Sequence, residues 1–247
     1  MMKKRMCTTL GLGIIALVVL PGFSFAQNDT TGPAMIGEPM HDFTLPVYQG
    51  GEISLSNLKG RMVMLIFPRG KFKPDEWCHL GMYKYVELCD FVEENNIKEK
   101  LNLLDIFYVI SYNREMIDDW FDELPQQLKD IEKWKNPPDA DNLTGRRKVF
   151  LERVRRTFPK KYAYKQREIP MPIPILIDEE ARLSSRLGIF SPGWDGGEGP
   201  QNIPSVYIVD VNGILRFKYL AQNTWDRPGY DYLMRVTPCA FSWGRKR

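Results

Sequence analysis

The stretch FPRGKFKPDEWCHLGMYKYVELCDFV, residues 67 to 92, carries the clearest structural signal of this chain. It begins at the end of RMVMLIF (61 to 67), a near-continuous apolar run that is typical of a strand covered on both faces. From Trp77 the chain becomes helical, because small and apolar residues recur at steps of three, four and seven. Those residues are Cys78, Gly81, Met82, Tyr85, Leu88, Cys89 and Val92. The pattern predicts a buried strand followed by an amphipathic helix with Cys78 in its first turn.

Further apolar runs give the remaining elements. Upstream, two short strands are predicted around Gly50-Gly51, and downstream, buried strands at 103 to 111 and 173 to 178. The runs SVYIVD and ILRFKYL flank VNG, a strong hairpin signal because Asn-Gly tolerates the positive φ of a tight turn. The order is β-α-β, insertion, β-α, antiparallel hairpin and α. It predicts an α/β fold with a central mixed sheet flanked by helices, since strand, helix, strand implies a parallel pair.

The N-terminus resembles a secretory signal peptide of 26 residues. A basic start precedes an apolar run, Leu10 to Leu20, which is shorter than the roughly 20 residues of a membrane helix. We therefore expect export to the periplasm or the extracellular space without stable membrane insertion. Residues 27 to 38 are polar and contain Gly and Pro, which predicts a flexible leader before a single domain at 39 to 247.

Composition limits the partners. Without the first 26 of its 247 residues the chain has 221, of which 31 are Lys or Arg and 31 are Asp or Glu. A net charge near zero argues against nucleic acid or anionic membrane as a general partner. With only His41 and His79 and no Cys-x-x-Cys pair, the sequence predicts neither a metal site nor a cofactor.

Residues 113 to 170 form an insertion with two helical patterns, about 115 to 134 and 142 to 158, separated by Pro137-Pro138. We interpret the basic cluster of the second pattern as a solvated helix face rather than a binding site for an anion or a partner. Its members are Arg146, Arg147, Lys148, Arg153, Arg155 and Arg156.

Three cysteines follow the signal peptide, so at least one has no cysteine partner in the chain. Cys78 precedes a helix whose unpaired N-H groups and dipole favour a thiolate. A helix terminus alone is a weak stabiliser, and Arg69 is our candidate for the additional charge. The alternative is that Cys78 is a buried small residue. Cys89, in mid-helix, is predicted to be structural.

Helix geometry separates Cys78 from Cys89 by about 16 Å, whereas a disulfide needs Cα atoms within about 7 Å. The two cannot pair without unwinding of the helix. Cys239, near the C-terminus, is the remaining candidate for a resolving thiol, within the chain or between the subunits of a homodimer.

The sequence resembles the peroxiredoxin group (alkyl hydroperoxide reductase and thiol-specific antioxidant, or redoxin, family), which has a thioredoxin-like fold. The resemblance spans about Ile36 to Val236, interrupted by the insertion. It depends on IGEPMHDFTLPVYQGGEISLSNLKG, FPRG, WC at the start of a helix, PILIDEEARLSSRLGI and IPSVYIVDVNGILRFKYLAQNTWDRP.

The resemblance implies a chemistry. Cys78 would be the peroxidatic nucleophile, which attacks a hydroperoxide and becomes a sulfenic acid that a thiol reductant then resolves. Arg69 would stabilise the thiolate, Trp77 would wall the pocket, and Pro204 would face it as a cis-proline. The pattern departs from the family at Lys71, Asp75, Gly81 and Pro204, where relatives carry Pro, Thr, a second Cys and Arg.

These departures leave a second hypothesis open. The chain would then be a non-catalytic scaffold of the same fold, whose insertion docks a partner through an exposed apolar patch. The candidate patch residues are Trp120, Phe121 and Trp134.

Overall fold

The computed structural model describes residues 32–165 and 168–244. The predicted signal peptide and the first residues of the predicted leader lie outside this range. Within the described range, no helix is long and apolar enough to cross a membrane.

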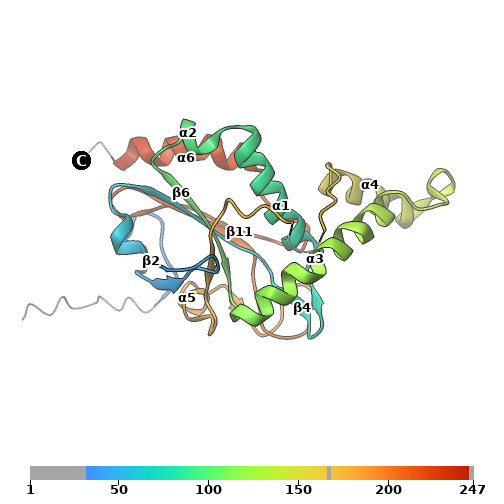
Figure 1. Ribbon diagram of the computed structural model, residues 1–247, viewed down its shortest axis with the longest axis horizontal. Coiled ribbons are helices and arrows are strands. Elements are labelled where there is room, and N and C mark those ends of the chain that lie inside the picture. Colours follow the sequence, from blue (N-terminus) through green and yellow to red (C-terminus); the bar gives the residue numbers. More distant parts are fainter. Residues whose placement is uncertain (1–31, 166–167, 245–247) are drawn as a thin grey trace, which may run out of the picture. The chain divides into compact units, whose positions relative to one another are not determined.

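A five-stranded mixed sheet in the order β11-β10-β3-β6-β7 forms the centre of the domain (Figure 1). Its strands are β3 (Met62–Phe67), β6 (Leu104–Ile110), β7 (Ile175–Ile177), β10 (Ser205–Val209) and β11 (Leu215–Leu220). β3, β6 and β7 are parallel, whereas β10 runs antiparallel to both β3 and β11. The predicted fold class, a central mixed sheet flanked by helices, is confirmed.

The position of β3 in the centre of the sheet explains why its sequence is apolar at every position. All six of its residues are buried. Because side chains alternate across a strand, Met64 and Ile66 enter the core on one face of the sheet, while Val63 and Leu65 enter the core on the other. A strand between two cores has no position for a polar side chain.

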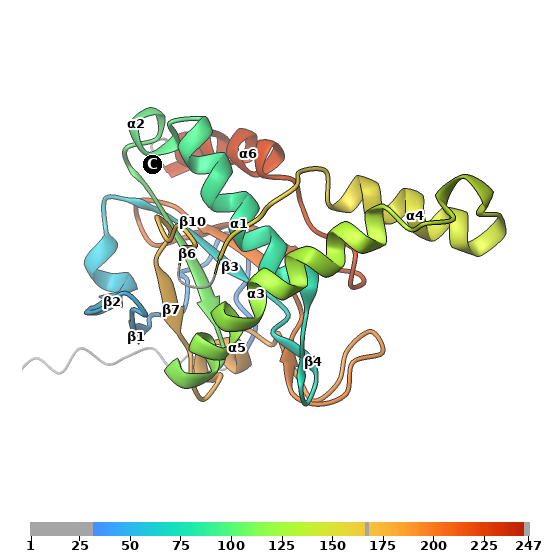
Figure 2. The same ribbon diagram turned by 45° about the vertical axis from the view of Figure 1, so that its right-hand side comes forward.

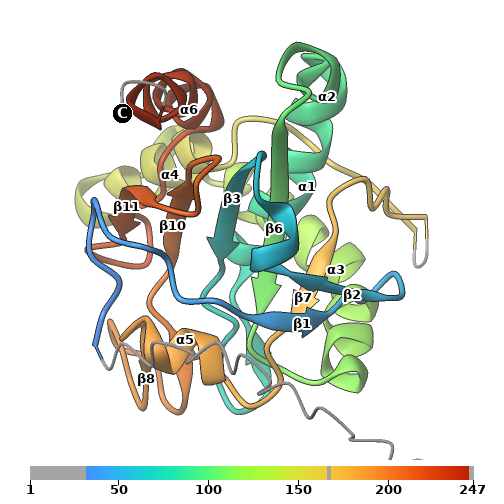
Figure 3. The same ribbon diagram turned by 90° about the vertical axis from the view of Figure 1, so that its left-hand side faces the viewer.

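Helices cover one face of the sheet, and a helix with the N-terminal hairpin covers the other (Figure 3). The first face packs against α1 (His79–Glu94), α2 (Ile97–Lys100), α3 (Arg114–Lys135) and α6 (Tyr230–Gly244). The second face packs against α5 (Arg182–Arg186) and the segment that holds β1 (Thr44–Pro46), β2 (Glu52–Ser54) and a 3-10 turn, η1 (Leu55–Leu58). The predicted order of elements is confirmed.

The predicted insertion contains one helix that belongs to the core fold, α3, followed by an additional helical segment. α3 is the crossover that two parallel strands, β6 and β7, require. Trp120 and Phe121 of α3 are buried, so they are core residues. After a second 3-10 turn, η2 (Ala140–Asn142), α4 (Gly145–Thr157) lies beside the end of α3 (Figure 2). All six basic residues of its cluster are exposed, as expected of a solvated face.

Two hairpins of very short strands were not expected from the sequence. β4 (Lys71–Lys73) pairs with β5 (Glu76–Trp77), and β8 (Phe190–Ser191) pairs with β9 (Gln201–Asn202). Strands of two or three residues are too short to show an alternating pattern. The first hairpin occupies the chain between β3 and Cys78.

The described part of the predicted leader is held in place. The Gly37 amide donates to the Leu215 carbonyl at 2.8 Å, and the Leu215 amide donates to the Glu38 carbonyl at 2.9 Å. Lys218 donates from Nζ to the Ala34 carbonyl at 2.8 Å. These bonds join residues 34 to 38 to β11, and the flexibility of the leader stays a prediction.

Candidate functional site

Cys78 is the N-cap residue of α1 and follows β5 directly. Its amide donates to the Gly70 carbonyl at 3.0 Å, and its own carbonyl accepts from the Gly81 amide at 2.9 Å. The thiol thus lies at the positive end of a helix of 16 residues, as the sequence predicted.

The Cys78 side chain lines a cavity of about 230 Å³. Cys78 is only 5 % exposed, and this cavity lies directly beside it. Loops, α1, α3 and α4 all contribute to the lining, which consists of Arg69, Phe72, Cys78, His79, Leu80, Trp134, Phe150, Phe158, Thr224 and Trp225. A buried thiol beside a cavity differs from a thiol enclosed in a core, because only the first has free space next to it for a small molecule.

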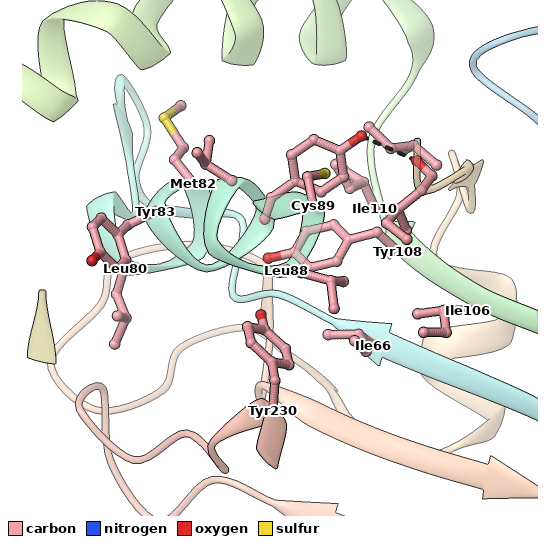
Figure 4. Packing of buried hydrophobic residues seen from close by; sticks show 14 of the residues in the cluster. Ile66, Leu80, Met82, Tyr83, Leu88, Cys89, Ile106, Tyr108, Ile110 and Tyr230 are labelled. Carbon is pink, nitrogen blue, oxygen red and sulfur yellow. Dashed lines mark hydrogen bonds between the residues drawn. The ribbon is translucent and has the colours of Figure 1, made fainter. Parts of the chain in front are cut away.

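Cys89 is a thiol enclosed in the core. It is 2 % exposed and lies within the packed cluster between α1 and β6 (Figure 4). Burial raises the pKa of the Cys89 thiol to about 12, because the thiolate would lose its hydration there. Cys89 is therefore a protonated core residue at neutral pH, in agreement with the structural role expected for it.

Arg69 lines the same cavity as Cys78 and is held by four hydrogen bonds. Its Nε donates to Gln201 Oε1, its Nη1 to Thr224 Oγ1 at 2.7 Å, and its Nη2 to the carbonyls of Trp194 (2.6 Å) and Asp195 (3.2 Å). These bonds use four of its five N-H groups. The fifth, on Nη1, has no protein acceptor among the described residues. The guanidinium is therefore a fixed cation at the cavity.

A glycine allows this arrangement. A Cβ atom at Gly197 would lie 2.4 Å from Arg69 Nη2 and 2.5 Å from Gln201 Nε2. Any larger residue there would displace the guanidinium from its bonding partners.

Arg227, in the loop after β11, is a second guanidinium that our sequence reasoning missed. Burial is the main cause that lowers the pKa of Arg227, and the Arg69 charge lowers it further. Negative charge on Cys78 or Tyr108 has the opposite effect, so these groups lie within electrostatic reach. Arg227 Nη2 is enclosed and has no hydrogen-bond partner in the described part of the chain. Its only sequence signal was its place in the motif NTWDRP.

His79 was also missed as a site residue, although it directly follows Cys78. It lines the cavity, and its ring lies 4.6 Å from the Trp134 ring. Burial lowers the pKa of His79, and the carboxylates of Asp130 and Glu76 oppose this only in part. The imidazole is therefore neutral near pH 7, a form that can accept or donate one proton.

Trp77 and Pro204 do not line this cavity. Trp77 donates from Nε1 to Asp119 Oδ2 at 3.1 Å and packs edge-on against Tyr112, with ring centroids 5.0 Å apart. Pro204 borders a separate space of about 30 Å³ that Arg227 also lines. The expected cis-proline is wrong, since no described residue has a cis peptide bond and the bond before Pro204 is trans.

Cys239 is exposed on α6, and its Sγ lies 3.7 Å from the Arg235 carbonyl oxygen. Its neighbours Thr237 and Pro238 line a cavity together with Met62 at the start of β3, whereas Cys78 lies beyond the end of that strand. Six residues of strand span about 20 Å. An internal Cys78–Cys239 disulfide would therefore require a large rearrangement. Resolution by Cys239 of another copy stays a prediction.

The described residues hold no group of three or more His, Cys, Asp or Glu side chains with the spacing of a metal site.

Comparison with known proteins supports the fold. A crystal structure of a cysteine-to-serine mutant of the peroxiredoxin 6 of Arenicola marina matches with a TM-score of 0.50 and 16 % identity, over 83 % of this chain and 73 % of that chain. A solution structure from Bacteroides thetaiotaomicron, named as a candidate protein disulfide isomerase, matches with a TM-score of 0.44 and 14 % identity, over 85 % and 91 %. No family model and no curated protein sequence matches the chain.

The first of these likenesses, together with the mixed sheet, shows a thioredoxin-like fold of the kind found in peroxiredoxin 6. At 16 % identity it shows the fold alone, because one fold hosts many activities. Function has to be argued from the cavity at Cys78.

Proposed function

We propose that this protein is an exported thiol peroxidase that reduces hydroperoxides through the single nucleophile Cys78. The observation that carries the proposal is the position of Cys78, at the N-terminus of α1 and in a cavity that it shares with Arg69. The helix end and the guanidinium both place positive charge beside Cys78, where a nucleophilic sulfur carries negative charge. Export rests on the signal-like N-terminus alone.

The reaction balances with these groups. The Cys78 thiolate attacks the terminal oxygen of the hydroperoxide, an S–O bond forms, and the O–O bond breaks. The sulfur loses two electrons, and the leaving oxygen takes both together with a proton, so it departs as an alcohol or water. Cys78 is left as a sulfenic acid. One thiol of the reductant displaces water and forms a mixed disulfide with Cys78, and a second thiol releases Cys78 as the thiol while the two reductant sulfurs leave as a disulfide.

The charged and polar neighbours have separate roles in this scheme. Arg69, with its unused Nη1 hydrogen, stabilises the negative charge that develops on the leaving oxygen. Arg227 adds positive charge within electrostatic reach of Cys78. His79 lies in the same cavity and supplies a neutral imidazole for proton transfer. The reductant is a thiol of another molecule, because Cys78 and Cys239 lie at opposite ends of the sheet.

The test is a single addition of hydrogen peroxide to the Cys89→Ser, Cys239→Ser double variant, followed by trapping with dimedone and mass spectrometry. The expected product is a dimedone adduct on Cys78. The same protein with Cys78→Ser is the control and should give none. Absence of an adduct in the double variant, in protein shown to be folded by circular dichroism, would refute the peroxidase activity.

The scaffold hypothesis loses much of its support. Two of its three candidate patch residues, Trp120 and Phe121, are buried in the core. Trp134 is 37 % exposed, but it borders the cavity at Cys78 rather than a separate surface.

A further inference from the structure

A second cavity, of about 270 Å³, lies at the end of the sheet opposite Cys78. It adjoins the start of β6, which lies beside the start of the parallel strand β3, whereas Cys78 follows the end of β3. Its lining comes from the residue before β3, the end of α1, α2, the first half of β6 and the segment before β7. No residue of this lining belongs to the cavity at Cys78. The two cavities are therefore separate sites, and we call the second one the Lys98 cavity after a residue that lines it.

Part of the lining of the Lys98 cavity is apolar and buried. Val92, Ile97, Ile106 and Ile173 contribute to it, and each of them is at most 7 % exposed. An organic group that covers such side chains gains free energy in proportion to the apolar area that it buries. Because an apolar cavity of about 150 Å³ can hold benzene, the Lys98 cavity has room for a ring with a short chain.

Arg61 lines the cavity with part of its hydrogen-bonding capacity unused. Its Nε donates to Asp105 Oδ2, and its Nη2 donates to Asp105 Oδ1 at 2.8 Å and to the Asn102 carbonyl at 3.1 Å. These bonds fix the guanidinium and use three of its five N-H groups. The two N-H groups on Nη1 have no acceptor among the described residues, so they can donate to a ligand.

Lys98 adds a second cation to the same cavity. Its Nζ donates to the Pro172 carbonyl at 3.2 Å, which ties α2 to the segment before β7, and it has no carboxylate partner in the described part of the chain. Arg61, Lys98 and Asp105 are the charged residues of the lining, and their charges sum to +1. One negative charge would neutralise this sum, and a carboxylate can accept from both cations.

We infer that the Lys98 cavity binds a small organic monocarboxylate, with its apolar body against Ile97 and Ile106 and its carboxylate between Arg61 and Lys98. A neutral ligand would leave the positive charge uncompensated, and a dianion would be repelled by Asp105. The inference goes beyond the proposed peroxidase function and does not depend on it, because no step of it involves Cys78.

The first test compares a carboxylate with its neutral amide. The protein is titrated calorimetrically with 3-phenylpropionate and, separately, with 3-phenylpropanamide, which has nearly the same shape. We expect the carboxylate to bind about tenfold more tightly, because hydrogen bonds to a charged acceptor are stronger than those to a neutral one. Equal affinities of the two probes, or no binding of the carboxylate at millimolar concentration, would overturn the inference.

The second test changes the charge at Lys98. Lys98→Glu should weaken the binding of 3-phenylpropionate at least tenfold, because it replaces a cation by an anion at the cavity. Lys100→Glu is the matched control, since Lys100 is also an exposed residue of α2 but does not line this cavity. An equal loss in both variants would show that the probe responds only to the overall charge of the protein, and would overturn the inference.

A third measurement locates the probe, because the cavity at Cys78 also combines a guanidinium with apolar side chains. Nuclear Overhauser effects from the ring protons of 3-phenylpropionate to the methyl groups of Val92, Ile97 and Ile106 would support the site. Phe150→Ala changes only the cavity at Cys78 and should leave the affinity unchanged. A loss of binding in Phe150→Ala without a loss in Lys98→Glu would place the probe beside Cys78 and overturn the inference.

Discussion

Arg69 Nη1 donates to Thr224 Oγ1 at 2.7 Å, which ties the segment after β3 to the loop after β11. Thr224 donates in turn to Asp195 Oδ2, at 2.6 Å from its hydroxyl. Three loops that are far apart in the sequence thus meet around one guanidinium, and the position of the cation near Cys78 depends on all of them.

Thr224→Val tests this dependence. Valine keeps the shape of threonine but leaves a buried N-H of Arg69 without its acceptor, which costs about 1–3 kcal/mol. We expect a loss of unfolding free energy of that size in urea titrations, together with slower oxidation of Cys78. Thr44→Val, in β1, is the control for the loss of a hydroxyl elsewhere. Unchanged oxidation in a destabilised Thr224→Val protein would show that Arg69 does not assist the thiol.

Gly197→Ala should move Arg69 without removing it. The new Cβ would lie 2.4 Å from Nη2, and the side chains of Arg69 and Gln201 can shift while the backbone stays in place. Oxidation of Cys78 by hydrogen peroxide should slow by about tenfold, a change in barrier of about 1.4 kcal/mol. Gly229→Ala provides the matched control, because a Cβ there meets no atom within 4 Å. Equal rates in both variants would contradict the proposed role of Arg69.

Arg227→Gln should also slow oxidation by about tenfold or more, since removal of one group that stabilises developing charge has effects of this order or larger. Arg227→Lys retains the charge and should restore part of the rate. The measurement is the rate of sulfenic-acid formation, with thiolate absorbance recorded against pH as a second readout. If glutamine and lysine at this position behave alike, charge at Arg227 is irrelevant to the reaction.

The lowered pKa of His79 predicts that the free energy of unfolding depends on pH. Because burial lowers its pKa, the unfolded chain binds the His79 proton at a higher pH than the folded chain does. The His79 contribution to stability is therefore complete above the unfolded pKa of about 6.5 and is lost as the pH falls below it through the lower pKa of the folded state. His79→Gln should flatten the decline in unfolding free energy between about pH 7 and pH 5. An unchanged slope in the variant would contradict the assignment.

Cys89 should resist chemical modification in the folded protein. Its thiol is enclosed, and its raised pKa of about 12 leaves almost no thiolate at pH 8. Methyl methanethiosulfonate should modify Cys78 and Cys239 at that pH, and Cys89 only after denaturation, as peptide mass mapping would show. Rapid native labelling of Cys89 would mean that the core around α1 opens readily.

The parts of the fold that the sequence predicted are those with long apolar patterns. β3 and α1 have runs of six and 16 residues, which is enough for a period to show. The hairpins β4–β5 and β8–β9 have strands of two or three residues and could not be recognised in this way. The trans bond before Pro204 shows a second limit of prediction from the sequence. A family resemblance can assign a residue to a place in the fold, but it does not fix the isomer of the peptide bond at that residue.

Only those residues of the candidate site that lie close together in the sequence could be predicted. Cys78 and Arg69 stand close together in the chain, beside a strand end and a helix start that the pattern reveals. Phe150 and Trp225 come from distant segments that only tertiary packing brings to the cavity at Cys78, and Arg227 comes within electrostatic reach of Cys78 in the same way. No periodicity or spacing links them to Cys78, so their role could be read only from the folded chain.

The path of the chain around the sheet has a consequence for how such a protein can diverge. α4 lies between the crossover helix α3 and the start of β7, where Tyr108 still pairs with Ile175 whatever the intervening length. The exposed residues of α4 can therefore be exchanged without a shift in strand register, whereas Leu151 and Val154 are buried. Cys78 and the part of the cavity wall that α4 supplies belong to separate parts of one chain, so the wall can change while the surroundings of the thiol on α1 stay constant.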